Sequence, residues 1–139
     1  MNAEAPHWHL LGAGAIGCLY AHALHRGGCQ VTLVQRTGAI PGKLSVVVEH
    51  DGTRSDIQLD AITPQSQARI THLLVATKAY DVCAAVAGVA HLLCEDCAVV
   101  LLVNGMGLAE ALHKQLADDL PQLDIYCGTT TEGAYTVAA

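Results

Sequence analysis

The sequence predicts an α/β protein built on a doubly wound, mostly parallel sheet with an inserted β-hairpin. Three observations lead to this expectation. Short β-rich apolar runs alternate with longer segments of helical periodicity. The first three elements, within residues 7–35, form a strand–helix–strand unit, which requires parallel pairing and a right-handed crossover. Hydrophobic residues make up 52% of the chain and charged residues 14%, a balance that favours elements buried on both faces.

The first unit is predicted as a strand over residues 7–11, a helix over residues 15–26 and a strand over residues 30–35. The apolar residues of the helix recur at the spacing of one helical face: Ile16, Leu19, Tyr20, Ala23 and Leu24. His22 lies off this stripe, and two glycines at residues 27–28 end the helix. The segment is therefore an amphipathic helix between two strands.

The alternation continues after a hairpin. Two β-like runs, residues 44–49 and 53–60, flank an Asp-Gly dipeptide at residues 51–52 that favours a tight turn. The elements that follow are a strand over 72–77, a helix over 81–93, a strand over 98–103, a helix over 108–116 and a strand over 123–127. No closing helix or strand follows the last polar loop. We expect residues 1–139 to be one domain and a fragment of a longer two-domain protein.

Charge and hydropathy argue against several classes of function. The chain has 7 Lys plus Arg against 13 Asp plus Glu, and the resulting net charge of −6 argues against a nucleic-acid surface. Its uncharged apolar runs are far shorter than the roughly 20 residues that cross a membrane. The first residues lack the basic and apolar regions of a secretory signal. We therefore expect a cytoplasmic protein with no nucleic-acid or membrane partner.

The 6 cysteines fit the same compartment. In a reducing cytoplasm they are expected to behave as small buried hydrophobic residues rather than as a disulfide framework. His91, Cys94 and Cys97 have a spacing that suits metal ligands, but a structural zinc site usually takes four ligands. We therefore expect no metal.

A GxGxxG motif follows the first strand and opens the first helix. It consists of Gly12, Ala13, Gly14, Ala15, Ile16 and Gly17. In this strand–turn–helix context the motif is typical of Rossmann-type dinucleotide-binding domains. The first glycine allows the tight turn, the second lets the backbone approach a pyrophosphate, and the third lets the helix pack on the strand. The N–H groups and the positive end of the helix dipole then face the anion. The alternative is a glycine-rich turn without a ligand.

The end of the second strand indicates which dinucleotide is bound. An NAD site usually places Asp or Glu there to hold the ribose 2′-hydroxyl. This chain has Gln35 and Arg36 instead. A guanidinium binds a 2′-phosphate, which a carboxylate would repel. The sequence therefore favours NADP(H) over NAD(H), the alternative being that Arg36 is a solvated surface residue.

Three further segments follow later strands and are expected at the same edge of the sheet, because the carboxyl ends of parallel strands face the ligand crevice. Lys78 can reach a cofactor phosphate. Asn104 can donate to and accept from a ribose hydroxyl or a substrate carbonyl. The polar loop over residues 128–134 closes the row. An ordinary solvated lysine, an Asn-Gly turn and a plain loop are the respective alternatives.

The segments GAGAIG, VQR, LLVATKAY, LLVNGMG and GTTTEGAY resemble, in order and approximate spacing, the ketopantoate reductase (2-dehydropantoate 2-reductase) family over residues 10–135. The resemblance implies NADPH-dependent reduction of 2-dehydropantoate to (R)-pantoate, on the route to pantothenate and coenzyme A. It also implies roles for particular residues. Residues 12–17 would hold the pyrophosphate, Arg36 and Lys78 the 2′-phosphate side, and Asn104 would lie between nicotinamide ribose and substrate. Ala134 would border the nicotinamide.

The family also has a helical second domain that carries its catalytic lysine, and nothing in this chain resembles it. The resemblance therefore implies a cofactor-binding half that is inactive alone and needs that domain in cis; a homodimer is left open. Trp8 and His9 stand in the first strand where the family more often has aliphatic residues.

Two other functions remain open from the sequence. A non-enzymatic NAD(P)-sensing Rossmann module would need the glycine turn but has no use for the Asn-Gly-Met-Gly segment at residues 104–107. A related reductase of another 2-keto acid would share every motif of this chain, because the residues that select the substrate lie elsewhere in the family.

Overall fold

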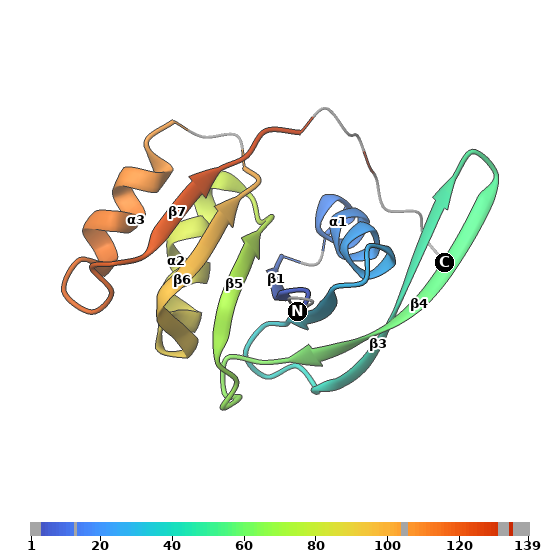
Figure 1. The fold of residues 1–139 in the computed structure, drawn as a ribbon, viewed down its shortest axis with the longest axis horizontal. Helices are drawn as coiled ribbons and strands as arrows, with labels where there is room; N and C mark the ends of the chain where they lie inside the picture. Colours follow the sequence, from blue (N-terminus) through green and yellow to red (C-terminus); the bar gives the residue numbers. More distant parts are fainter. Residues whose placement is uncertain (1–3, 13, 104–105, 131–133, 135–139) are drawn as a thin grey trace.

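The computed structural model describes residues 4–12, 14–103, 106–130 and 134. Within them the chain forms a seven-stranded sheet of order β3-β4-β2-β1-β5-β6-β7 (Figure 1). The elements are β1 (His7–Leu11), α1 (Ala15–Arg26), β2 (Gln30–Val34), β3 (Gly42–His50), β4 (Thr53–Ile62), β5 (Ile70–Val75), η1 (Ala79–Asp81), α2 (Val82–Val89), η2 (Ala90–Leu92), β6 (Leu93–Leu101), α3 (Leu108–Leu116) and β7 (Asp124–Cys127). Among the described helices, none is long and apolar enough to cross a membrane.

All neighbouring strands pair in parallel except β3 and β4, which pair antiparallel. The order reverses at β1, because the chain first builds outward through β2 and β4 and then resumes on the other side with β5. This is the doubly wound Rossmann-type topology that the sequence predicts. The carboxyl ends of β1 and its two neighbours meet at the point of reversal, where such sheets leave a crevice.

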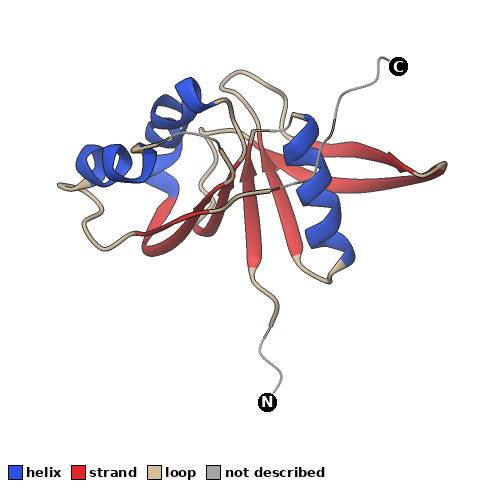
Figure 2. Ribbon diagram, turned by 90° about the horizontal axis from the view of Figure 1, so that it is seen from above, coloured by secondary structure: helices blue, strands red, loops and turns tan. Residues whose placement is uncertain are grey.

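The hairpin is part of the main sheet. Asp51 and Gly52 form its turn with positive φ values of 49° and 77°, as the Asp-Gly dipeptide predicts. β4 returns parallel to β2, with Thr32 opposite Asp60. The strand β3 thus occupies the connection between β2 and β4 where a crossover helix is usual, and it becomes the sheet edge. The long twisted ribbon of β3 and β4 extends away from the rest of the domain (Figure 2).

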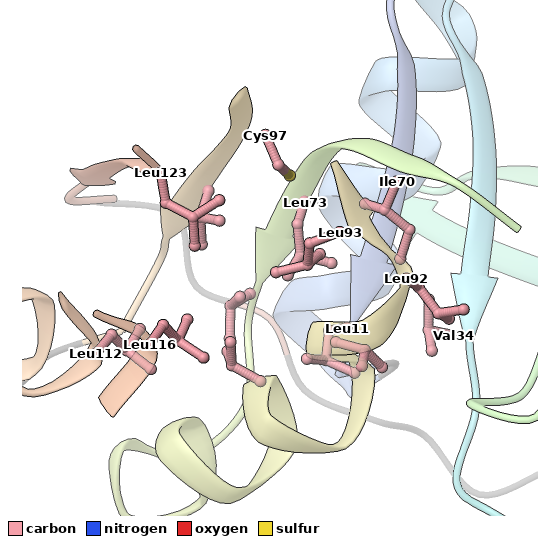
Figure 3. Packing of buried hydrophobic residues seen from close by; sticks show 14 of the residues in the cluster. Leu11, Val34, Ile70, Leu73, Leu92, Leu93, Cys97, Leu112, Leu116 and Leu123 are labelled. Carbon is pink, nitrogen blue, oxygen red and sulfur yellow. The ribbon is translucent and has the colours of Figure 1, made fainter. Parts of the chain in front are cut away.

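Two apolar clusters lie on opposite faces of the sheet. Leu11, Val34 and Leu73 belong to the cluster under α2 and α3, whereas their chain neighbours Leu10 and Leu33 belong to the cluster under α1. This alternation is the two-residue period of strands buried on both sides. Figure 3 shows the first cluster, to which side chains of β5, β6 and α3 contribute. The sheet therefore has a hydrophobic core on each face, one under α1 and the other under α2 and α3.

Two local expectations need correction. The helix predicted over residues 81–93 is shorter: α2 ends at Val89, a 3₁₀ turn follows, and Leu93 already begins β6. An irregularity in the β5–β6 register between Ile70 and His72 accommodates this early start. His22, placed off the apolar stripe, is 8% exposed, because the hairpin packs on α1 and Ser55 hydrogen-bonds its Nε2 at 2.8 Å.

Candidate functional site

A cavity of about 1230 Å³ lies at the carboxyl ends of the central strands. Seven of the described residues singled out from the sequence line it: Gly12, Gly14, Ala15, Ile16, Arg36, Lys78 and Ala134. Gly17 is buried in α1 and is not among the lining residues, and the predicted residues Ala13 and Asn104 fall outside the described residues. Motifs that are more than 100 positions apart in the sequence therefore share one cavity.

Backbone hydrogen bonds beyond the strands hold the floor of this cavity. The N–H of Ala76 donates to Leu11 O at 2.9 Å, and the N–H of Leu102 donates to Val75 O at 2.9 Å. The N–H of Gly128 donates to Leu101 O at 2.8 Å. The segments that leave β5, β6 and β7 are therefore fixed to their neighbours before they reach the cavity.

Gly12 and Gly17 are required by the turn itself. Gly12 has φ of 101°, and a Cβ there would lie 2.8 Å from the carbonyl carbon of Ala76. A Cβ on Gly17 would lie 1.9 Å from the carbonyl oxygen of Gly12. A residue with a side chain could not occupy either position, because the clashing backbone atoms could move only at a large cost in free energy. These two glycines let α1 begin directly against β1 and β5.

Gly14 is different, because nothing in the described fold requires a glycine there. Its backbone is extended, with φ of −80° and ψ of −167°, and a Cβ would meet no heavy atom within 4 Å. It is the N-cap of α1 and makes no side-chain cap. The open space beside it faces the cavity, at a helix end whose N–H groups and dipole favour an anion.

Two basic side chains line the same cavity. Arg36 follows β2, whose end is fixed by the N–H of Gln35 donating to Ile62 O at 2.7 Å. Lys78 follows β5, and the N–H of Asp81 donates to its carbonyl at 2.9 Å as the chain turns into η1. The ion pairs between described residues include neither Arg36 nor Lys78. Both cations are thus available to an anionic ligand.

Sequence reasoning missed one wall of the cavity. Pro64 and the small residues Ala84, Ala85 and Gly88 line it on the side of α2. Nothing in the pattern of the α2 residues distinguishes them from ordinary helix positions. The cavity is therefore lined by small apolar residues as well as by the two cations.

The buried titratable residues His9 and Cys97 are not among the residues that line the cavity. His9 is 2% exposed in the central strand, and burial together with the neighbouring His7 lowers its pKa to about 4. Burial raises the pKa of the Cys97 thiol to about 12, so it stays protonated and unreactive. His91 Nε2 hydrogen-bonds Pro64 O at 2.7 Å. No group of three candidate metal ligands occurs among the described residues.

The fold and the cavity define an α/β domain of Rossmann type with a cavity at its topological switch point that Arg36 and Lys78 line. The sequence model of the ketopantoate reductase PanE/ApbA family matches residues 8–139. The chain belongs to this family.

A curated relative agrees with this assignment, and solved structures share the fold. The chain is 35% identical over 127 residues to the 2-dehydropantoate 2-reductase of Shigella flexneri, covering 90% of this chain and 39% of that protein. The solved 2-dehydropantoate 2-reductase from Methylococcus capsulatus has a TM-score of 0.72 at 19% identity, over 96% of this chain and 43% of that one. A D-mandelate dehydrogenase solved with NADH and anilino(oxo)acetate has a TM-score of 0.72 at 20% identity, over 91% and 41%. The chain thus spans about two fifths of the length of the curated relatives it matches.

Proposed function

We propose that this chain binds NADP(H) in the cavity at the switch point. The observation that carries the proposal is Gly14, which is open on the cavity side at the start of α1 and is not needed by the fold. A pyrophosphate beside Gly14 would meet the free N–H groups of the helix and the turn at residues 12–17. The cavity volume, about 1230 Å³, is ample for a dinucleotide.

We further propose that Arg36 and Lys78 hold the 2′-phosphate side of the cofactor, which makes the site selective for NADP(H). The support is that Arg36 and Lys78 line the cavity and take part in none of the ion pairs between described residues, and that no acid stands at the end of β2. By the resemblance to the family, Ala134 would border the nicotinamide, and Asn104 would lie between the nicotinamide ribose and the substrate. A calorimetric titration tests this. We expect NADPH to bind more tightly than NADH, and equal affinities would refute the role of Arg36.

We propose that the whole protein reduces 2-dehydropantoate, as the names of its curated relatives suggest. The bound cofactor would supply the hydride, and this chain's part is to bind and orient it. Reduction of a ketone also needs a proton donor near the developing alkoxide and a partner for the substrate carboxylate. Among the described residues, the basic side chains that line the cavity are Arg36 and Lys78, and both would bind the 2′-phosphate rather than the substrate. The donor is therefore expected on a second domain, like the helical domain of the family.

This assignment predicts that the 139-residue chain binds nucleotide yet does not turn over 2-dehydropantoate. Loss of a general acid costs about 10²–10⁴-fold, and lost positioning costs more. The assay follows NADPH oxidation at 340 nm and compares this chain with a longer form that includes the second domain. Comparable rates would place the proton donor within residues 1–139. Turnover by the longer form of a different 2-keto acid, but not of 2-dehydropantoate, would favour the related reductase over the proposed one.

A further inference from the structure

A hydrogen bond joins the first helix to the segment that follows the last strand. The hydroxyl of Tyr20, on α1, donates to Oγ1 of Thr130 at 2.5 Å, across 110 positions of sequence. In Figure 1 residues 128–130 leave β7 towards the side of the sheet where α1 lies. The bond therefore fixes the point at which the segment reaches α1.

The Tyr20 hydroxyl is held in place by the rest of its side chain. The ring is half-buried against the apolar cluster under α1, so the hydroxyl cannot move without loss of that packing. Tyr20 is not among the described residues that line the cavity, whereas Thr130 is. Any effect of Tyr20 on a bound ligand must therefore act through its partner.

The position of Thr130 relates it to one half of the cavity. The sheet order places β2, which leads to Arg36, on one side of the glycine turn, and β6 and β7 on the other. Gly128 and Thr130 follow β7, and they line the cavity together with Leu102 and Val103, which follow β6. A dinucleotide whose pyrophosphate lies at the turn and whose 2′-phosphate meets Arg36 would place its nicotinamide half on this second side.

We propose that Tyr20 is a positioning residue for the nicotinamide half of the cofactor. Its hydroxyl holds Thr130, and with it the cavity wall after β7, at the distance from the glycine turn that the nicotinamide ribose requires. The role rests on the proposed binding of NADP(H) and adds to it a residue that touches no ligand. Tyr20→Phe removes the hydroxyl and keeps the ring in its apolar packing.

The test compares two ligands by calorimetry. NADPH reaches both halves of the cavity, whereas adenosine 2′,5′-bisphosphate carries only the adenosine and 2′-phosphate side. For Tyr20→Phe we expect NADPH to bind about two- to tenfold more weakly, the range that one hydrogen bond supports. Affinity for adenosine 2′,5′-bisphosphate should stay unchanged, which a general loss of structure would not allow.

Variants of Thr130, the hydrogen-bond partner of Tyr20, complete the experiment. Thr130→Val should reproduce the loss, the double variant should add nothing to it, and Thr130→Ser, which keeps a hydroxyl, should bind as the unmodified chain does. Tyr126→Phe is the matched control, since Tyr126 is 55% exposed on β7 and lies outside the described lining of the cavity. Unchanged NADPH affinity in Tyr20→Phe, or equal weakening of both ligands, would overturn the proposal. If the unmodified chain binds neither ligand, the proposed function itself fails.

Discussion

Substitutions at the glycines of the turn should separate an effect on nucleotide binding from an effect on stability. Gly14→Val adds three carbon atoms at a position where a Cβ would meet nothing within 4 Å. The extended backbone of Gly14 also suits a β-branched residue. We therefore expect the free energy of unfolding to change by no more than about 1 kcal/mol, the scale of an altered helix N-cap.

The same change should remove nucleotide binding. The added methyl groups would occupy the space in which the pyrophosphate approaches the backbone of Gly14. We expect the Kd of both NADPH and NADH to rise at least about 100-fold, which corresponds to about 2.7 kcal/mol. Loss for both nucleotides follows because the pyrophosphate is common to the two.

Gly17→Ala is the contrasting variant. Its single added carbon would lie 1.9 Å from the Gly12 carbonyl oxygen, so α1 and the turn would have to separate. Overpacking against backbone should cost about 3 kcal/mol or more of unfolding free energy. Urea unfolding followed by the fluorescence of Trp8, the one tryptophan, and calorimetry with both nucleotides would measure the pair. A Gly14→Val chain that unfolds, or that binds normally, would refute the reasoning.

Two other substitutions follow from the same structure. Arg36→Ala should weaken NADPH about ten- to a hundredfold and leave NADH nearly unchanged in calorimetry, because a charge-assisted contact to the 2′-phosphate contributes about 1.5–3 kcal/mol; equal losses for both nucleotides would contradict this. His9 is held neutral in the fold by a pKa lowered to about 4, whereas in the unfolded chain it takes up a proton below about 6.5. Stability should therefore fall as the pH drops from about 6.5 towards 4, by at most about 3 kcal/mol. Urea unfolding at pH 7.5 and 4.5 should show a smaller pH dependence in His9→Leu, and an identical dependence would exclude His9 as its source.

Local signals predicted the first unit of the fold well, because its boundaries are set by glycines. The bounds of α1 agree with the prediction, since one glycine turn precedes it and Gly27 caps its end. The region after Val89 could not be predicted in this way. A short apolar run such as the one at Leu93 fits a helix or a buried strand equally well, and pairing with β5 decides for the strand.

The candidate site was predictable where a residue directly follows a strand. Arg36 and Lys78 share a cavity because parallel strands end at a common edge. The small residues of α2 were missed, since Ala84 and Gly88 carry no chemical signal of their own. The burial of His22 likewise depends on the hairpin, which is distant in sequence and reaches α1 only in the folded chain.

The most direct test of the account is to map NADPH onto the chain by amide ¹H–¹⁵N chemical shifts. The amides of Gly12, Gly14 and Gly17 should shift on titration, together with that of Arg36. The amide of Gly52, at the tip of the hairpin and outside the lining of the cavity, should stay in place. Shifts confined to another surface, or no shifts at millimolar NADPH, would contradict the claim that the switch-point cavity is a dinucleotide site.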